Sequence, residues 1–334
     1  MTTSYVLSVV FGLALGACDA VETSTTEQAG VNLQGVNLQG VNLQGVNLQG
    51  VNLQGIRLDG ATLSGGGLDH LRVERGELVA ERAGVTLRGT ALVGAHLYAQ
   101  VQNVHVTPPV TSVVEYRISA IDPELTQYDP TKTGNTFLYS LEQWVDDTAS
   151  WQSACGPDLD GRSVAIPLAG TWNEHGDRLD SSSLFTFGCT TGVIAKCYRW
   201  GYRPWVTGYG DLTAMHWTCT RLARADYCGD GTPHTRDGTS VNVWDRLPAP
   251  GPIQRHGLLA PLGMLFEAGW NTGGAVCLSH TRWLLNGGLA IAATCPDRLL
   301  VGGLLPLVCD TMGQVLGIDG SAMMFDEAYL NLGL

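Results

Sequence analysis

CTTGVIAKCYRWGYRPWVTGYGDLTAMHWTCTRLARADYC, from Cys189 to Cys228, is the stretch of sequence that decides the fold. Its apolar residues recur with a helical period over residues 191–200 and again over residues 212–227, which predicts two helices. A glycine-rich turn around Gly208 separates the two segments. We therefore expect the two helices to fold back on each other as an antiparallel hairpin.

Four cysteines lie in this stretch, two in each half, and their spacing fits the hairpin. Residues that face each other in an antiparallel pair have position numbers with a constant sum. We therefore predict the disulfides Cys197–Cys219 and Cys189–Cys228, since bridged Cα atoms must lie within about 7 Å. A zinc site is disfavoured because no C-x2-C pair is present. The sequence leaves open how the other four cysteines pair, namely Cys155, Cys277, Cys295 and Cys309.

Short segments rich in β-branched and aromatic residues lie on both sides of the predicted hairpin. Gly, Asp and Pro separate them, which is typical of an antiparallel sheet. Residues 71–80 also predict a strand pair, with Gly76 at its turn. The order of strands, then helices, then strands predicts an α+β fold, a disulfide-rich antiparallel sheet with a helical hairpin. The other expected strands are residues 113–121, 137–141, 163–168, 184–187, 266–270 and 275–283.

A repeat precedes this domain. Val-Asn-Leu-Gln-Gly occurs five times without change from Val31 to Gly55, and two looser units continue in phase to Gly65. A fixed short period indicates a repeat architecture, and this one resembles the pentapeptide-repeat family. The resemblance implies a right-handed square β-solenoid with the Val and Leu side chains inside. Because so few units make fewer than two coils, a short ordered solenoid and a flexible spacer are both open.

The start of the chain indicates export. An apolar run from Val6 to Ala17 ends in Leu15-Gly16-Ala17-Cys18, which resembles a bacterial lipoprotein signal. The resemblance implies cleavage before Cys18 and a lipid on that cysteine, which would anchor the protein to the outer membrane or cell surface. The first five residues lack Lys and Arg, which is atypical of a signal, and a secreted form with an unmodified Cys18 is the alternative. An oxidising compartment would suit a chain with nine cysteines.

Changes in composition along the chain set the expected domain limits, and the net charge restricts the expected partners. We expect a signal peptide over residues 1–18, a tether over 19–30, repeats over 31–65, a strand-rich connector or further coil over 66–100, and an α+β domain over 101–334. The chain carries 19 basic and 31 acidic residues, a net charge of -12. This charge disfavours nucleic acid as a partner, and it leaves the lipid as the expected link to the membrane.

The run Ala225-Asp226-Tyr227-Cys228 carries a second resemblance. Together with the upstream runs from Gly201 to Trp205 and from His216 to Arg221, it resembles the bacterial ADYC-domain family over about residues 110–300. The resemblance implies an exported, often lipid-anchored protein. It implies no mechanism, because the family has no established activity.

The polar segment after this run has two interpretations. In the first, residues 229–239 form tight turns at the end of a helix, which is the interpretation we favour. In the second, His234 and Asp237, with His216 or His280, act as base and orienting group of an exported hydrolase. A nucleophile is then lacking, since the sequence has no G-x-S-x-G motif and the cysteines are expected in disulfides.

The sequence also leaves open whether the domain has a ligand site. Asp230, Asp237 and Asp245 offer oxygen ligands for Ca²⁺, but their spacing is not that of an EF-hand loop, and we predict no cofactor. Tryptophans could line a groove for glycan, although we expect them in the core; they are Trp200, Trp205, Trp217, Trp244, Trp270 and Trp283. The sequence therefore predicts a surface binding or structural module with a glycan or protein ligand, and a hydrolase, metal-assisted or not, as the alternative.

Overall fold

The computed structural model describes residues 58–103, 110–124, 136–158, 160–173, 175–181, 184–206, 208–236, 239–248, 250–256, 263–283, 288–301 and 305–330. The predicted signal peptide with Cys18, the predicted tether and the unchanged repeat units lie outside the described residues, and so does Asp237.

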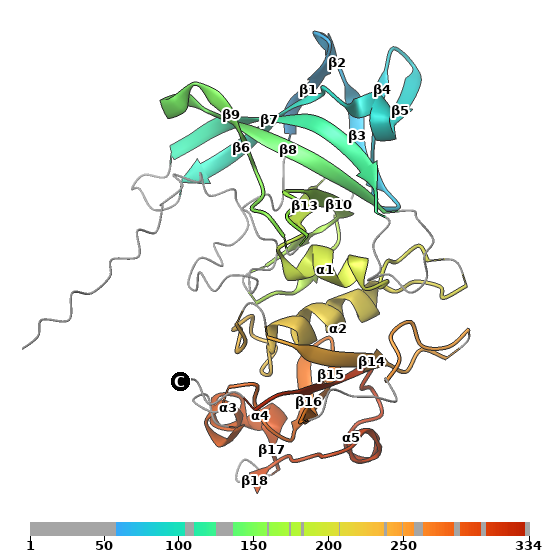
Figure 1. Ribbon diagram of the computed structural model, residues 1–334, viewed down its shortest axis with the longest axis vertical. Helices are drawn as coiled ribbons and strands as arrows, with labels where there is room; N and C mark the ends of the chain where they lie inside the picture. Colours follow the sequence, from blue (N-terminus) through green and yellow to red (C-terminus); the bar gives the residue numbers. More distant parts are fainter. Residues whose placement is uncertain are drawn as a thin grey trace, which may run out of the picture. The chain divides into compact units, whose positions relative to one another are not determined.

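The first strand of the described chain belongs to an eight-stranded antiparallel sheet (Figure 1). Its order is β13-β10-β8-β7-β6-β1-β2, and β9 pairs with β8. Along β7, Val114, Tyr116 and Ile118 are buried while the residues between them face outward, so one face builds a core and the other is solvated. The strands are β1 (Leu58–Leu63), β2 (Gly66–Gly67), β6 (His96–Asn103), β7 (Val110–Pro123), β8 (Phe137–Val145), β9 (Ser150–Ser153), β10 (Ala165–Ala169) and β13 (Phe185–Cys189).

The end of the repeat tract takes part in this sheet. Strand β1 covers most of the two looser units and pairs antiparallel with β6, where Thr62 lies opposite His96. Ala61 is buried in the core of the sheet. These residues therefore form a strand between β6 and β2, because β6 supplies a backbone partner that an isolated coil of two units lacks.

A three-stranded sheet follows, made of β3 (Asp69–Glu74), β4 (Glu77–Arg82) and β5 (Val85–Arg88). The predicted hairpin is confirmed: Glu74 pairs with Glu77 across a two-residue turn in which Arg75 and Gly76 both have positive φ. The backbone N–H of Leu78 donates to the Tyr139 hydroxyl over 2.8 Å. A 3-10 turn, η1 (Gly89–Leu92), leads on to β6.

The two predicted helices are α1 (Val193–Arg199) and α2 (Thr213–Arg224), which pack together (Figure 1). The predicted disulfide Cys197–Cys219 joins them, with Cα atoms 5.9 Å apart. The α+β prediction is confirmed.

The predicted disulfide Cys189–Cys228 is wrong, because neither residue lies in a helix. Cys189 is the last residue of β13 and bonds to Cys155. Cys228 lies beyond α2, after Ala225 turns the chain with a φ of 50°, and bonds to Cys295. The facing rule of an antiparallel pair holds only inside the helices, which are shorter than expected. The last bridge joins Cys277 to Cys309.

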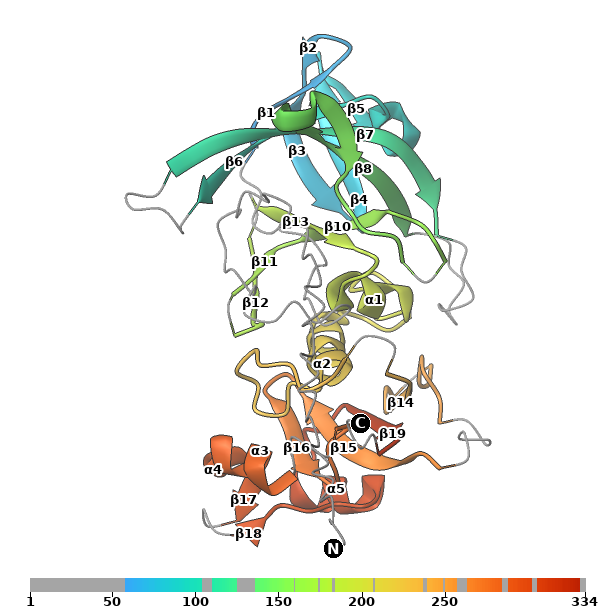
Figure 2. The same ribbon diagram turned by 60° about the vertical axis from the view of Figure 1, so that its left-hand side comes forward.

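The C-terminal part of the chain builds a second antiparallel sheet in the order β14-β19-β15-β16 (Figure 2). β19, the last of these strands in the described sequence, therefore lies between β14 and β15. The strands of this second sheet are β14 (Val241–Asp245), β15 (Leu265–Asn271), β16 (Gly274–Leu278) and β19 (Met324–Ala328). The remaining elements are η2 (Asp146–Thr148), β11 (Thr171–Trp172), β12 (Arg178–Leu179), α3 (Gly288–Thr294), α4 (Pro296–Leu299), β17 (Leu300–Val301), β18 (Leu305–Pro306) and α5 (Met312–Ile318).

Candidate functional site

His216, a candidate base, lies inside the helix pair. It is 1% exposed, its Nε2 donates to the Ile194 carbonyl oxygen over 3.0 Å, and its ring stacks on Tyr198 with centroids 4.3 Å apart. Burial lowers the pKa of His216 to about 4, so the ring is neutral at physiological pH. A sealed ring of this kind cannot reach a substrate, and it holds α1 against α2.

The other candidate histidines have different surroundings. His234 stacks on Tyr227 with ring centroids 5.5 Å apart, and burial lowers its pKa. Both ring nitrogens of His280 face backbone carbonyl oxygens at 3.2 Å, those of Thr281 and Leu265. Each of the three histidines is thus held by its own structural contacts. Asp237 lies outside the described residues.

The candidate Ca²⁺ ligands are also separated. Exposed Asp230 accepts from the backbone N–H of Thr232 in a tight turn. Asp245 is buried and accepts from the Tyr202 hydroxyl and the Gln254 backbone N–H over 2.9 and 2.7 Å. No group of three or more His, Cys, Asp or Glu residues with the geometry of a metal site occurs among the described residues.

Four of the six tryptophans have different surroundings. Trp270 and Trp244 are buried, whereas Trp205 packs on Tyr198 and Trp283 lies under the Arg236 guanidinium, 4.0 Å away. The contacts of these four rings therefore do not indicate a shared groove for a sugar.

The run Ala225 to Cys228 forms a turn in which each residue has a separate structural role. Ala225 ends α2 in the left-handed region. Asp226 is sealed and accepts from Arg221 Nη1 over 2.5 Å and from the Gly231 backbone N–H over 3.1 Å. Tyr227 is 0% exposed, and its backbone carbonyl accepts from Ala275. Only Cys228 reaches the surface.

Tyr227 belongs to a buried polar cluster that the sequence did not indicate. Its hydroxyl donates to Glu267 on β15 over 2.8 Å, and the Arg282 guanidinium donates to both carboxylates of the cluster, those of Glu267 and Asp326. Trp270 Nε1 donates to Asp326 over 2.7 Å. Burial, and then the adjacent Glu267, raise the pKa of Asp326 well above its usual value. The cluster is fully enclosed, so it braces β15, β19 and α2 and offers no site for chemistry.

One groove of about 340 Å³ lies beside the start of α2. Met215 and Met323 contribute its apolar lining, and Asp211 and Arg246 add charges of opposite sign. Hydrogen bonds from Thr213 lower the pKa of Asp211, which keeps its carboxylate ionised. Arg246 Nη1 donates to the carbonyl oxygen of Gly320 over 3.0 Å. Sequence reasoning missed this groove because its residues come from three distant segments, none of which carries a motif.

No helix among the described residues is long and apolar enough to cross a bilayer. The model of a family described as pentapeptide repeats (8 copies) matches residues 29–65. No curated protein and no solved structure matches the chain. The model of the ADYC domain matches residues 89–284, more than half of the chain, including the sealed turn that carries Asp226 and Tyr227. The chain therefore belongs to the ADYC domain family.

Proposed function

We propose that the protein is a cell-envelope lipoprotein whose folded domain is a surface binding module, with the groove beside α2 as its ligand site. The observation that carries the proposal is the contrast between two sets of residues. His216, His234 and His280 are engaged in separate structural contacts. Asp211 and Arg246 stand exposed at an open concavity with an apolar lining. Such a mixture of apolar surface and a few polar or charged groups is typical of pockets that bind small ligands.

The alternative of a hydrolase has less support. A general base needs a ring nitrogen within hydrogen-bond reach of the proton that it removes. His234 lies flat on Tyr227, and its backbone N–H donates to the Arg224 carbonyl oxygen, so the residue is part of the turn after α2. We expect His234→Ala to change stability and to leave no assayable activity altered.

Ligand titrations test the groove. The probes are a disaccharide of N-acetylated sugars and a set of short peptides with free termini, followed by NMR chemical shifts or calorimetry. We expect one probe class to bind, and Arg246→Ala to weaken that binding about tenfold or more because a cation at the groove is lost. Arg255→Ala is the matched control, since Arg255 is an exposed arginine that does not line the groove. Binding that Arg246→Ala leaves unchanged, or no binding of either class, refutes the assignment of the groove.

The anchor is tested separately. Metabolic labelling with a palmitate analogue should mark the protein, and Cys18→Ala should abolish the mark. An exported wild-type protein that carries no label would refute the lipoprotein proposal without affecting the groove.

A further inference from the structure

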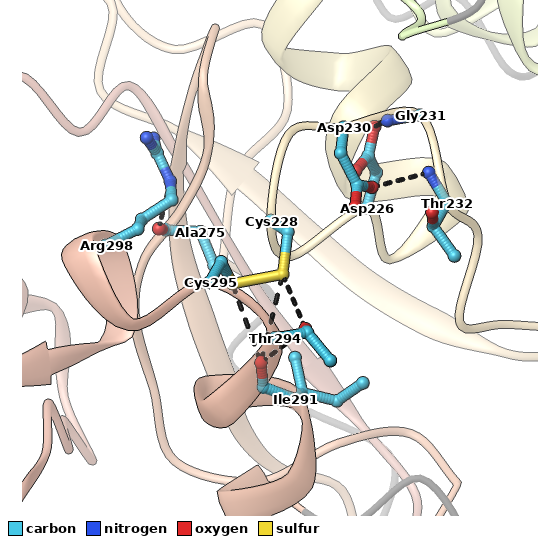
Figure 3. Close-up of a disulfide and its surroundings, with 10 residues drawn as sticks. All are labelled: Asp226, Cys228, Asp230, Gly231, Thr232, Ala275, Ile291, Thr294, Cys295 and Arg298. Carbon is cyan, nitrogen blue, oxygen red and sulfur yellow. Dashed lines mark hydrogen bonds between the residues drawn. A yellow bond between two sulfur atoms is a disulfide. The ribbon is translucent and has the colours of Figure 1, made fainter. Parts of the chain in front are cut away.

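The disulfide Cys228–Cys295 differs from the other three bridges in its exposure. Cys155, Cys189, Cys197, Cys219, Cys277 and Cys309 are each at most 3% exposed. Both sulfurs of Cys228–Cys295 belong to half-buried residues at the surface, beside the exposed Thr294 at the end of α3 (Figure 3). Exposed bridges are the ones that exchange with thiols, because the attacking thiolate must reach a sulfur along the S–S axis.

The two halves of this bridge are held very differently. On one side, Cys228 follows Tyr227 and Asp226, whose side chains are sealed in the core. On the other side, Cys295 lies between two short helices, α3 and α4, with exposed residues at 293, 294, 296 and 297. The bridge is therefore a clamp between a rigid turn and a C-terminal arm, which we define as residues 288–299.

The family match supports this division. It ends at residue 284, so Cys228 lies inside the matched domain and Cys295 lies outside it. Ile291 and Ala292 of the arm are buried in the core cluster that contains Tyr227. Opening the clamp would remove the covalent link between the arm and the turn and would leave noncovalent contacts, such as the hydrogen bond from Arg298 Nε to the Ala275 carbonyl oxygen over 2.8 Å.

We propose that Cys228–Cys295 is a thiol-exchange site, at which an incoming thiolate attacks Cys295 Sγ and releases the C-terminal arm. The inference is independent of the groove. Thr294 Oγ1 lies 3.1 Å from Cys228 Sγ and also donates to the Ile291 carbonyl oxygen over 2.7 Å (Figure 3). Rotation of this hydroxyl can turn its proton toward a developing thiolate at Cys228. Cys228 is therefore the leaving sulfur and Cys295 the attacked one.

The exchange balances in two steps. The thiolate forms a bond to Cys295 Sγ, and the electron pair of the broken S–S bond leaves on Cys228 Sγ. A second thiol, as thiolate, attacks the external sulfur of the mixed disulfide, which releases the oxidised thiol and the Cys295 thiolate. Two thiols thus supply the two electrons that reduce the bridge.

Graded glutathione tests the proposal on the full oxidised chain. After alkylation of new thiols, peptide mapping should find Cys228 and Cys295 labelled at a glutathione concentration about tenfold lower than the six buried cysteines require. Early samples should carry glutathione on Cys295. Opening of any other bridge first, or of all bridges together, refutes the proposal. Glutathione on Cys228 refutes the assignment of the attacked sulfur.

Hydrogen exchange tests the release of the arm. Selective reduction should speed exchange about tenfold in residues 288–295 and leave residues 225–231 unchanged, because buried backbone bonds hold that turn. The double variant Cys228→Ser, Cys295→Ser should reproduce the pattern without reductant. If the double variant does not fold, hydrogen exchange of the reduced wild-type chain, compared with that of the oxidised chain, is the test. Equal exchange of the arm in the reduced and oxidised chains contradicts the clamp.

Discussion

The hydroxyl of Tyr227 donates to Glu267 Oε1 over 2.8 Å inside the core, with both residues 0% exposed. The backbone N–H of Arg282 donates to the same hydroxyl over 3.1 Å. The tyrosine of the family signature thus links the end of α2, strand β15 and the segment after β16. A single oxygen atom holds three parts of the fold in register.

Tyr227→Phe removes that oxygen and keeps the ring. We expect it to lower the free energy of unfolding by about 1–3 kcal/mol, because a buried N–H and a buried carboxylate each lose a partner. Urea unfolding followed by tryptophan fluorescence measures the change. Tyr209→Phe, at the half-buried residue of the groove, is the matched control and should be nearly neutral. Equal stability of Tyr227→Phe and wild type would contradict a structural role for the hydroxyl.

Gly229→Ala should be strongly destabilising. Gly229 has a φ of +71°, and an added Cβ would lie 1.8 Å from the Gly273 carbonyl oxygen. Gly210 has a φ of +72°, and no heavy atom lies within 4 Å of an added Cβ there. Gly210→Ala should therefore cost only the backbone strain of about 1–2 kcal/mol. Gly229→Ala should cost at least about 2 kcal/mol more, since backbone must move. Comparable losses in thermal unfolding would show that the close approach is absent.

His216 should make stability depend on pH. Burial lowers the pKa of His216 to about 4 from 6.5. At a pH between these two values, the unfolded chain therefore binds a proton that the folded chain does not bind. The contribution is fully present above pH 6.5 and is lost as the pH falls through about 4. It amounts to roughly 3 kcal/mol. His216→Gln should flatten this part of the unfolding free energy against pH.

The control for this pH effect is His70→Asn, at an exposed residue with positive φ that asparagine tolerates. It should leave the profile of the wild type unchanged. A His216→Gln profile parallel to that of the wild type between pH 4 and 6.5 would mean that the ring is not sealed in solution.

Truncation should show that the family match is shorter than the folding unit. A chain ending at residue 284 loses β19, Cys295 and Cys309, together with the Asp326 partner of Arg282. We expect it to lack a cooperative unfolding transition by circular dichroism. A chain ending at residue 330 keeps all described elements and should unfold like the wild type. A stable, cooperative product from the shorter chain would place the C-terminal segment outside the core.

Local patterns allowed much of the fold to be predicted. The helical period located α1 and α2, and the spacing of Cys197 and Cys219 identified their bridge because both lie inside those helices. The turn chemistry of Arg75-Gly76 located a hairpin in the same way. Each of these features depends on residues that are near in sequence or on one regular element.

Features that depend on distant segments could not be predicted. Glu267, Arg282 and Asp326 each look like ordinary polar residues in sequence, and only the sheet order β19-β15-β16 brings them together. The partner of Cys228 is 67 residues away, so its choice follows from where α3 and α4 settle on the core. The groove could not be predicted either, because Asp211, Arg246 and Met323 belong to separate elements or loops.

The position of β19 sets the order of events during synthesis. The ribosome delivers β19 after β14, β15 and β16, yet this strand hydrogen-bonds to both β14 and β15. Until then β15 has a bare edge, and Arg282 has no second carboxylate to face. The C-terminal sheet therefore closes only after β19 has been synthesised, and until then the facing edges of β14 and β15 stay open to chaperones.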